Sequence, residues 1–563
     1  MSKTPKVPSS TMTPPAPWRA IAQRKQQERQ SRIPSAWLLS SPPPPTTLNV
    51  LSIPRTSGIL TPSELSITES YDATSLANAL LSRDLKAEDV AIAFCKRAAI
   101  AQQVCNCLTE IFFDDAIARA KWLDNEYKRT GEPVGPLHGV PISLKDTFKV
   151  KGYDASIGLA ALAENPAKEN SLLVDLLLEA GAVLYCKTNI PQTLMALDSD
   201  NNLFGRVLNP KDRRVTAGGS SGGEGALVAM RGSVLGVGTD VGGSIRIPAM
   251  CNGLYGIKPS AQRIPYVGQE GGQRPGASKI ALPASAGPIA RSLRDCELFL
   301  QTISNMKPWE RDPAVVYGMW DEQGAIQEKP LIGVIRTDGL ITPLPPIAKV
   351  VDEMVQKLRQ SGQEVFEIDA AAFKKCQSLA NAFFGIDGGN FMFDLLEETS
   401  EPLINWLSTR LKRKPPTTLP NLVDIHAKKI ELETEMLKIW RDPKTGRTID
   451  AIICPVAPHP TPPIDRWNGA SYTSSFVLLD YPAATLPVRE FKESDLEGEL
   501  AAVEPLGSWD KIIGDERTID RKVYLNTTLC VQVIAPKMQE RRLVEAMRFI
   551  DEVIHEDSVR ARL

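Results

Sequence analysis

The sequence predicts an α/β fold: one large domain with a central mixed, twisted β-sheet that helices cover on both faces. Two observations predict it. Beyond residue 140, short β-prone runs alternate with helical segments, and this alternation is typical of a sheet layered with helices. The chain also has 563 residues, of which 42% are hydrophobic, so it is long and apolar enough to bury a large core.

Residues 1–60 are expected to form a Pro-rich arm ahead of this domain. They contain eleven of the 44 prolines, which favours extended polyproline stretches. Within the arm, residues 18–32 are basic and rich in glutamine, and they predict a short helix. We expect this helix to lie over the core, with binding of an acidic partner as the alternative.

The domain itself is expected over residues 61–563. Thr61 and Glu64 make a capping box, and Pro62 suits the first helical position. Apolar spacing then predicts helices over 72–84, 87–104 and 114–129, the last of which Gly131 ends. The β-prone runs are 140–144, 182–186, 331–335, 364–368, 451–454 and 530–534. The helices that alternate with them are 171–180, 345–361 and 540–556. Residues 370–445 are polar and helical, and we expect them to be a helical insertion.

Composition and charge disfavour several classes of function. The net charge of −2 gives no general attraction to nucleic acid. No run of about 20 apolar residues is present, so no membrane anchor is expected. The nine cysteines form no C-x-x-C pair, which favours buried free thiols in a cytoplasmic protein. The C-terminal Ala561-Arg562-Leu563 is a conservative variant of a peroxisomal signal, so peroxisomal targeting is the alternative location.

Residues 217–260 differ from the rest of the chain, because two glycine clusters that contain serine flank a helix candidate. Glycine allows backbone N–H groups to converge on one point, where they bind an anion or a developing oxyanion. A phosphate loop is disfavoured because Gly-Lys-Ser/Thr is missing. Gly218-x-Ser220-x-Gly222 fits a nucleophile elbow, but that chemistry needs a histidine, and nothing marks any of the four histidines as catalytic. Plain turns and serine caps are the remaining alternative.

An upstream lysine offers a different general base. Lys145 ends the apolar run at 140–144, and burial lowers the pKa of a lysine from about 10.4 towards neutrality. A neutral amine can accept a proton in place of histidine. Together with this lysine, the motifs Gly-Gly-Ser-Ser-Gly-Gly and Gly-Thr-Asp-x-Gly-Gly-Ser-Ile-Arg resemble the amidase signature family over roughly residues 60–560. Glu224-Gly225 and Gly135-Pro-Leu-His138 look most like its fungal acetamidase branch.

The resemblance implies an amidase-signature catalytic domain with a Ser–cis-Ser–Lys triad. Ser244 matches the nucleophile, Ser220 the bridging serine and Lys145 the base. The residues that the resemblance implies as oxyanion donors or substrate contacts are Val241, Gly242, Gly243, Ser244, Leu194, Thr193 and Ser220. Those expected to support them are Ser221, Asp240 and Arg246. His138 is expected to pack near the site rather than to catalyse.

The implied activity is hydrolysis of a small-molecule carboxamide to a carboxylate and ammonia or an amine, through an acyl-enzyme and with no cofactor or metal. Where relatives usually carry Asn-x-x-Gly-x-Pro, this chain reads Val-Leu-Leu-Asp-Tyr-Pro over 477–482, which leaves the identity of the amide open. The alternatives are the amide-transfer subunit of a glutamine-dependent amidotransferase, an amide hydrolase or esterase of a biosynthetic pathway, and a non-catalytic anion-binding protein. A homodimer is one possible assembly, and the sequence does not decide the oligomeric state.

Overall fold

The computed structural model describes residues 16–320, 325–326, 329–369, 371–442, 445–466, 470–497, 505–508, 510–511 and 520–560. Within these residues, eleven strands form one sheet in the order β1-β3-β2-β4-β6-β5-β10-β11-β9-β7-β8. The strands are β1 (Leu108–Ile111), β2 (Pro141–Lys145), β3 (Val183–Thr188), β4 (Leu235–Asp240), β5 (Tyr255–Lys258), β6 (Ser285–Ala290), β7 (Ile332–Val334), β8 (Val365–Glu367), β9 (Ala451–Pro455), β10 (Ala483–Glu490) and β11 (Thr528–Ile534).

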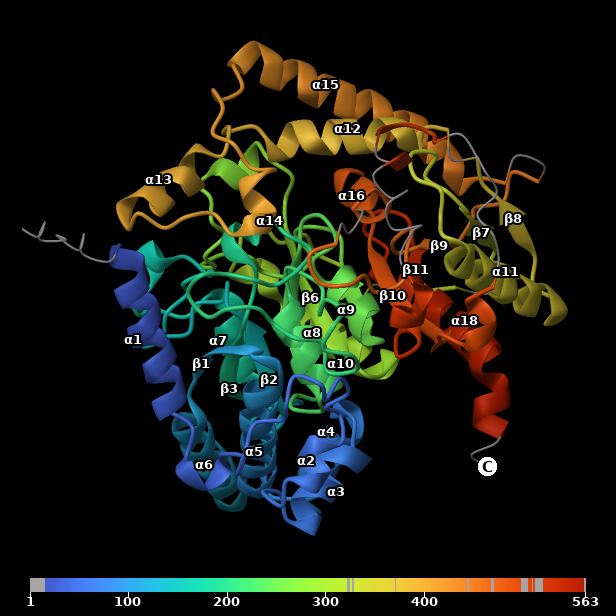
Figure 1. Cartoon of the computed structure of the whole chain (residues 1–563). Coiled ribbons are helices and arrows are strands. Elements are labelled where there is room, and N and C mark those ends of the chain that lie inside the picture. The colour runs from blue at the N-terminus through green and yellow to red at the C-terminus, as the bar shows by residue number, and fades with distance from the viewer. Residues whose placement is uncertain are drawn as a thin grey trace, which may run out of the picture.

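The sheet is mixed, as the sequence predicts. Strand β2 runs parallel to β3 and β4, and β7 runs parallel to β8 and β9. The neighbours between them, including β4 with β6 and β10 with β11, are antiparallel. Sheet and helices together make the expected α/β fold, and Figure 1 shows the sheet at the centre of the molecule.

The helices pack around this sheet (Figure 1). They are α1 (Pro17–Ser31), α2 (Ile53–Thr56), α3 (Pro62–Ser70), α4 (Ala73–Leu81), α5 (Ala87–Cys105), α6 (Phe113–Thr130), α7 (Leu172–Glu179), α8 (Gly222–Ala229), α9 (Arg246–Asn252), α10 (Leu293–Asn305), α11 (Pro345–Gln360), α12 (Phe373–Phe384), α13 (Asn390–Glu398), α14 (Asn405–Ser408), α15 (Leu419–Met436), α16 (Ser471–Leu478) and α18 (Glu540–Arg560). Helices α8 and α9 pack against each other and contact β4, β5 and β10.

Local sequence signals place the helix ends well. The Thr61 backbone N–H donates to Glu64, and the Glu64 N–H donates to the Thr61 hydroxyl, so the predicted capping box begins α3. Gly131, with φ of 82°, ends α6 in the left-handed conformation that glycine allows. The helices predicted over 87–104, 171–180 and 345–361 are confirmed as α5, α7 and α11 to within one residue at each end.

Five strands were not predicted from the sequence: β1, β4, β5, β6 and β10. Strand β4 contains Gly236 and Gly238, and β6 contains Gly287 and Pro288, so both segments look like turns to a propensity argument. The tertiary structure overrides that propensity. A Cβ at Gly287 would lie 2.1 Å from the Ile257 carbonyl oxygen of the neighbouring strand, so only glycine allows the backbones to approach this closely.

Helices α12 to α15 occupy most of residues 370–445, where the sequence predicts helices. They form a layer at the top of the view in Figure 1, and α12 packs against both α15 and α16. These helices are far from the glycine-rich segment in sequence. They lie over one end of the sheet. Helix α12 lies there together with α16, beside the end of β4.

Helix α1 of the N-terminal arm covers the edge strand β1. The Arg29 guanidinium donates to the Leu108 carbonyl at 2.6 Å, and the Arg32 guanidinium donates to the Ile111 carbonyl at 2.9 Å. Both carbonyls belong to the ends of β1, which has a partner strand on one side only. The helix therefore satisfies part of an open sheet edge, the kind of edge that otherwise invites pairing with another chain.

A buried lysine links this helix to the core through ion pairs. The Lys25 side chain is 4% exposed, and its ammonium lies 2.7 Å from a Glu110 carboxylate oxygen and 2.9 Å from an Asp154 carboxylate oxygen. Burial alone would lower the pKa of Lys25, but Glu110 and Asp154 raise it well above its usual value. Lys25 therefore stays charged, and its charge compensates two carboxylates that are buried with it.

Two further expectations concern cysteines and membranes. All nine cysteines are buried and free, as the sequence predicts. Among the described residues, no helix has both the length and the hydropathy needed to cross a membrane. The C-terminal tripeptide at 561–563 lies outside the described residues.

We predict that Lys25→Met lowers the free energy of unfolding by about 3–5 kcal/mol, because it removes the ammonium that pairs with the buried carboxylates of Glu110 and Asp154. Urea unfolding followed by tryptophan fluorescence measures this change. The matched control is Arg24→Ala on the same helix, since Arg24 pairs with Glu164 at the surface and an exposed pair contributes about 1 kcal/mol or less. Equal losses in the two variants would contradict the role given to Lys25.

Candidate active site

Lys145 is the last residue of β2 and is fully buried. Its Nζ donates to the Ser220 hydroxyl at 2.7 Å and to the Thr239 hydroxyl at 2.8 Å. Burial lowers the pKa of Lys145 to about 7, against the weaker opposing effects of Asp240 and Glu224. Near neutral pH a large fraction of this amine is therefore uncharged and has a free lone pair beside Ser220.

The serine segment before α8 joins Lys145 to the end of β4. The peptide bond between Gly219 and Ser220 is cis. The next residue, Ser221, donates its backbone N–H to the Ser244 carbonyl at 3.2 Å, and its hydroxyl lies 3.4 Å from both the N and the O of Thr239. Ser221 therefore holds Ser220 against the segment that carries Ser244, and among the described residues it forms no hydrogen bond with the side chain of Lys145 or Asp240.

Glu224 lies beneath this segment and connects α8 to two strands. Its carboxyl group accepts hydrogen bonds from Ser143 of β2 at 2.5 Å and from Thr188 of β3 at 2.9 Å. Burial raises the pKa of Glu224 to about 8. The facing residue of β4 is Gly236, where a Cβ would lie 2.1 Å from a Glu224 carboxyl oxygen. The glycine thus makes room for the carboxyl group that positions the strand of Lys145.

Asp240 shapes the turn between β4 and α9. Its carboxylate accepts the N–H of Gly243 at 2.7 Å and the N–H of Ile245 at 3.2 Å, and it pairs with the Arg246 guanidinium at 3.0 Å. Burial would raise the pKa of Asp240, but Arg246 holds it below its usual value. The ion pair therefore holds the turn, because the charge of Asp240 orients the backbone N–H groups of Gly243 and Ile245.

The same turn leaves three backbone N–H groups for a ligand. Val241, Gly242 and Ser244 donate to no acceptor among the described residues. The fourth expected donor, Gly243, directs its N–H to the Asp240 carboxylate instead.

Arg246 anchors the turn to distant parts of the chain. Its guanidinium is completely buried and donates to the Gln532 side chain and to the Thr473 carbonyl, each at 3.0 Å. The Thr473 hydroxyl in turn donates to the Gly242 carbonyl at 2.6 Å. The strand β11 and the helix α16 therefore fix the turn from the side opposite Lys145.

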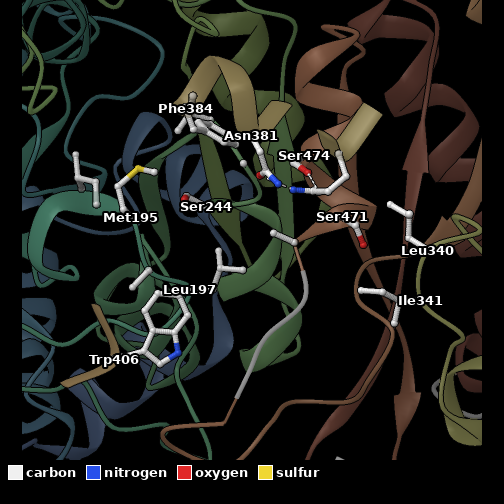
Figure 2. A pocket seen from close by; sticks show the side chains of 16 residues that line it. Met195, Leu197, Ser244, Leu340, Ile341, Asn381, Phe384, Trp406, Ser471 and Ser474 are labelled. Carbon is white, nitrogen blue, oxygen red and sulfur yellow. Dashed lines mark hydrogen bonds between the residues drawn. The ribbon is translucent and has the colours of Figure 1, made fainter. Parts of the chain in front are cut away.

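A pocket of about 170 Å³ opens beside Ser244 (Figure 2). The buried residues Lys145 and Ser220 lie behind Ser244, which is 5% exposed and is the member of the three that lines the pocket. The lining residues are Leu194, Met195, Ala196, Leu197, Val241, Gly242, Ser244, Leu340, Ile341, Gln377, Asn381, Phe384, Trp406, Ala470, Ser471 and Ser474. None of them is a histidine, which agrees with a base other than imidazole.

The two expected acyl-pocket residues have different positions. Leu194 lines the pocket, whereas Thr193 is buried and does not. Both have a positive φ, of 66° for Thr193 and 62° for Leu194, in a conformation that is uncommon for residues other than glycine. His138 is also outside the pocket: its Nδ1 accepts the Val134 N–H at 3.1 Å, so it packs as expected.

Sequence reasoning missed part of the site. Thr239 was not predicted as a site residue, although it lies inside the Gly-Thr-Asp motif. Its hydroxyl accepts a hydrogen bond from Lys145. The pocket residues Gln377, Asn381 and Ser474 come from α12 and α16, which no local pattern connects to the glycine-rich segment. Only the tertiary structure brings these helices to Ser244.

Comparison with known proteins agrees with this geometry. A family model described as Amidase matches residues 89–544. An acetamidase of Aspergillus oryzae is 36% identical over 551 residues, covering 96% of this chain and 99% of its own length. An acetamidase of Emericella nidulans is 35% identical over 538 residues, covering 94% and 96% respectively. A solved structure of a fatty acid amide hydrolase superposes with a TM-score of 0.87 at 29% identity, with 95% of each chain covered.

The family model and the two acetamidases confirm the resemblance that the glycine-rich motifs and Lys145 indicate. The solved structure confirms the fold over almost the whole chain. The chain therefore belongs to the amidase family and is a hydrolase that acts on the carbon–nitrogen bonds of amides.

Proposed function

We propose that this amidase works through a Ser244 acyl-enzyme, with Ser220 and the neutral amine of Lys145 as its proton relay. The observation that carries the proposal is the 2.7 Å hydrogen bond between Lys145 and Ser220. This bond lies behind Ser244, outside the pocket lining, and burial there lowers the pKa of Lys145 to about 7. A buried amine in this state is a competent general base near neutral pH.

The relay moves two protons in sequence. As Ser244 Oγ attacks the carbonyl carbon of the amide, its proton passes to Ser220 Oγ, and the Ser220 proton passes to Lys145 Nζ. Collapse of the tetrahedral intermediate breaks the C–N bond, and the relay returns a proton to the departing nitrogen. Water then attacks the acyl-enzyme by the same path, which releases the carboxylate and regenerates Ser244.

The oxyanion of the tetrahedral intermediate is stabilised by backbone N–H groups. Val241, Gly242 and Ser244 supply these groups in the turn that Asp240 and Arg246 hold. Loss of one such donor costs about 3–4 kcal/mol of transition-state stabilisation in well-studied hydrolases. Because Asp240 is already ionised and hydrogen-bonded, the turn needs little reorganisation when charge develops on the substrate.

The proposal does not require a partner protein. An amide-transfer subunit would pass its ammonia to a second active site, whereas this scheme releases it to water. Ammonia release from a simple carboxamide by the purified chain alone therefore separates hydrolysis from dependence on a partner. An anion-binding protein would give no turnover at all.

We predict that kcat/KM of the wild-type enzyme rises with pH up to about 7 and is level above it, because deprotonation of Lys145 creates the base. Lys145→Ala should lower kcat by a factor of about 10²–10⁴ and should remove the inflection near pH 7. Ammonia release measured between pH 5 and 9 tests both effects. A profile that keeps its inflection in Lys145→Ala would rule out Lys145 as the titrating base.

We also predict that a fluorophosphonate labels Ser244 covalently, with a single adduct seen by intact-protein mass spectrometry. Ser244→Ala should lose the adduct and all measurable turnover, since no other lining residue of the pocket has both a hydroxyl and an adjacent relay. Ser471→Ala is the matched control, because Ser471 lines the same pocket but has no contact with Lys145. An adduct that persists in Ser244→Ala would place the nucleophile elsewhere.

A further inference from the structure

The lining of the pocket beside Ser244 is mostly apolar but contains a group of polar side chains. The larger apolar side chains are Leu194, Met195, Leu197, Val241, Leu340, Ile341, Phe384 and Trp406. The polar ones are Gln377 and Asn381 from α12 and Ser471 and Ser474 from α16. In Figure 2, Met195 lies on one side of Ser244, and Asn381, Ser474 and Ser471 lie on the other, with Leu340 and Ile341 beside Ser471. A purely aliphatic acyl group would match the apolar side chains but not the four polar ones.

Three of the polar side chains form a continuous row of hydrogen bonds. The Ser474 hydroxyl donates to Gln377 Oε1 at 2.5 Å, and Gln377 Nε2 donates to Asn381 Oδ1 at 2.8 Å. Ser474 is completely buried, whereas Asn381 is exposed, so the row runs from inside the pocket to its opening. Within the described part of the chain, no acceptor is found for Asn381 Nδ2 and no donor for Ser474 Oγ.

These unpaired hydrogen-bonding atoms affect the binding free energy once a substrate fills the pocket. A hydroxyl or amide that loses water without gaining a partner costs about 1–3 kcal/mol. An acyl group without polar atoms would remove water from the inner end of the row and leave Ser474 Oγ without a donor. A substrate that carries its own hydrogen-bonding group would satisfy it instead. The row therefore selects between acyl groups of equal size.

The volume of the pocket also selects for size. A closed cavity of about 150 Å³ holds a benzene molecule, and this pocket has about 170 Å³. An acetyl group would leave most of that space without contacts, and unfilled space forfeits the attraction of the surrounding atoms. The pocket therefore fits an acyl group of about the size of one aromatic ring.

We propose that the row Ser474–Gln377–Asn381 binds a hydroxyl group on a ring-sized acyl group, so that the preferred substrates are hydroxylated aryl amides. The inference rests on the proposed function, because it assumes that the acyl group occupies the pocket beside Ser244. A hydroxyl both donates and accepts, so it can pair with Ser474 Oγ at the inner end of the row or with Asn381 Nδ2 at the outer end. It also matches them if either side-chain amide is turned by 180°, which exchanges its donor and acceptor ends.

The test compares matched primary amides by ammonia release: acetamide, phenylacetamide, and its 3-hydroxy and 4-hydroxy derivatives. The wild-type enzyme should prefer phenylacetamide to acetamide by about 10- to 100-fold in kcat/KM, the range expected for burying a ring. It should prefer at least one hydroxylated amide to phenylacetamide by about tenfold, the effect of one or two neutral hydrogen bonds.

Variants then locate the preference. Gln377→Met and Ser474→Ala should each reduce the ratio of hydroxylated amide to phenylacetamide to about one. Ser378→Ala is the control, because Ser378 stands next to Gln377 on α12 and is exposed; it should keep the wild-type ratio. Thermal unfolding shows whether Ser474→Ala folds, and Gln377→Met decides the question if it does not.

Three results would overturn the inference. They are a wild-type ratio near one, a ratio that survives Gln377→Met, and a preference for acetamide. In each case, labelling of Ser244 by the fluorophosphonate would show that the proposed function still stands. If Ser244 is not labelled and no amide is hydrolysed, the proposed function fails and this inference fails with it.

Discussion

The active site depends on how one lysine is buried. Lys145 and Lys25 are both removed from water, but their partners differ. Lys25 contacts the carboxylates of Glu28, Glu110 and Asp154, and its pKa is raised. Lys145 donates to two hydroxyls and forms no ion pair within the described residues, and burial lowers its pKa to about 7. A carboxylate in contact with Lys145 would keep its amine charged and remove the base, so neutral partners are a requirement of the proposed chemistry.

This requirement explains where the charges of the site lie. The two carboxyl groups that act on the pKa of Lys145, those of Asp240 and Glu224, each have other partners. Asp240 pairs with Arg246 and accepts two backbone N–H groups. Glu224 accepts from two hydroxyls, and burial raises its pKa to about 8, so it is largely uncharged at neutral pH. The site thus keeps negative charge away from the amine while still using both carboxyl groups to hold strands and the turn.

The glycine-rich sequence makes this arrangement possible, and it also explains what could be predicted. Lys145, Ser220, Ser244 and the Asp240–Arg246 pair lie in short motifs, so the sequence was sufficient to propose them as site residues. The same glycines conceal strands: Gly236 and Gly238 allow Glu224 and Ser221 to pack against β4, yet they lower the strand propensity of that segment. The sequence pattern could not show that the Gly243 N–H donates to the side chain of Asp240, three residues earlier.

The lining of the pocket was the part of the site that the sequence predicted least well. Its polar row joins α12 to α16, two helices about a hundred residues apart in sequence, as the separation of 97 between Gln377 and Ser474 shows. No motif spans such a distance, because contacts of this kind are set by packing of whole helices rather than by local chemistry. The proposed nucleophile and relay instead lie at the end of β2, in the segment before α8 and in the turn after β4. We therefore expect substitutions in α12 or α16 to change which acyl group is accepted without touching Lys145, Ser220 or Ser244, so that one scaffold can serve amides of different size and polarity.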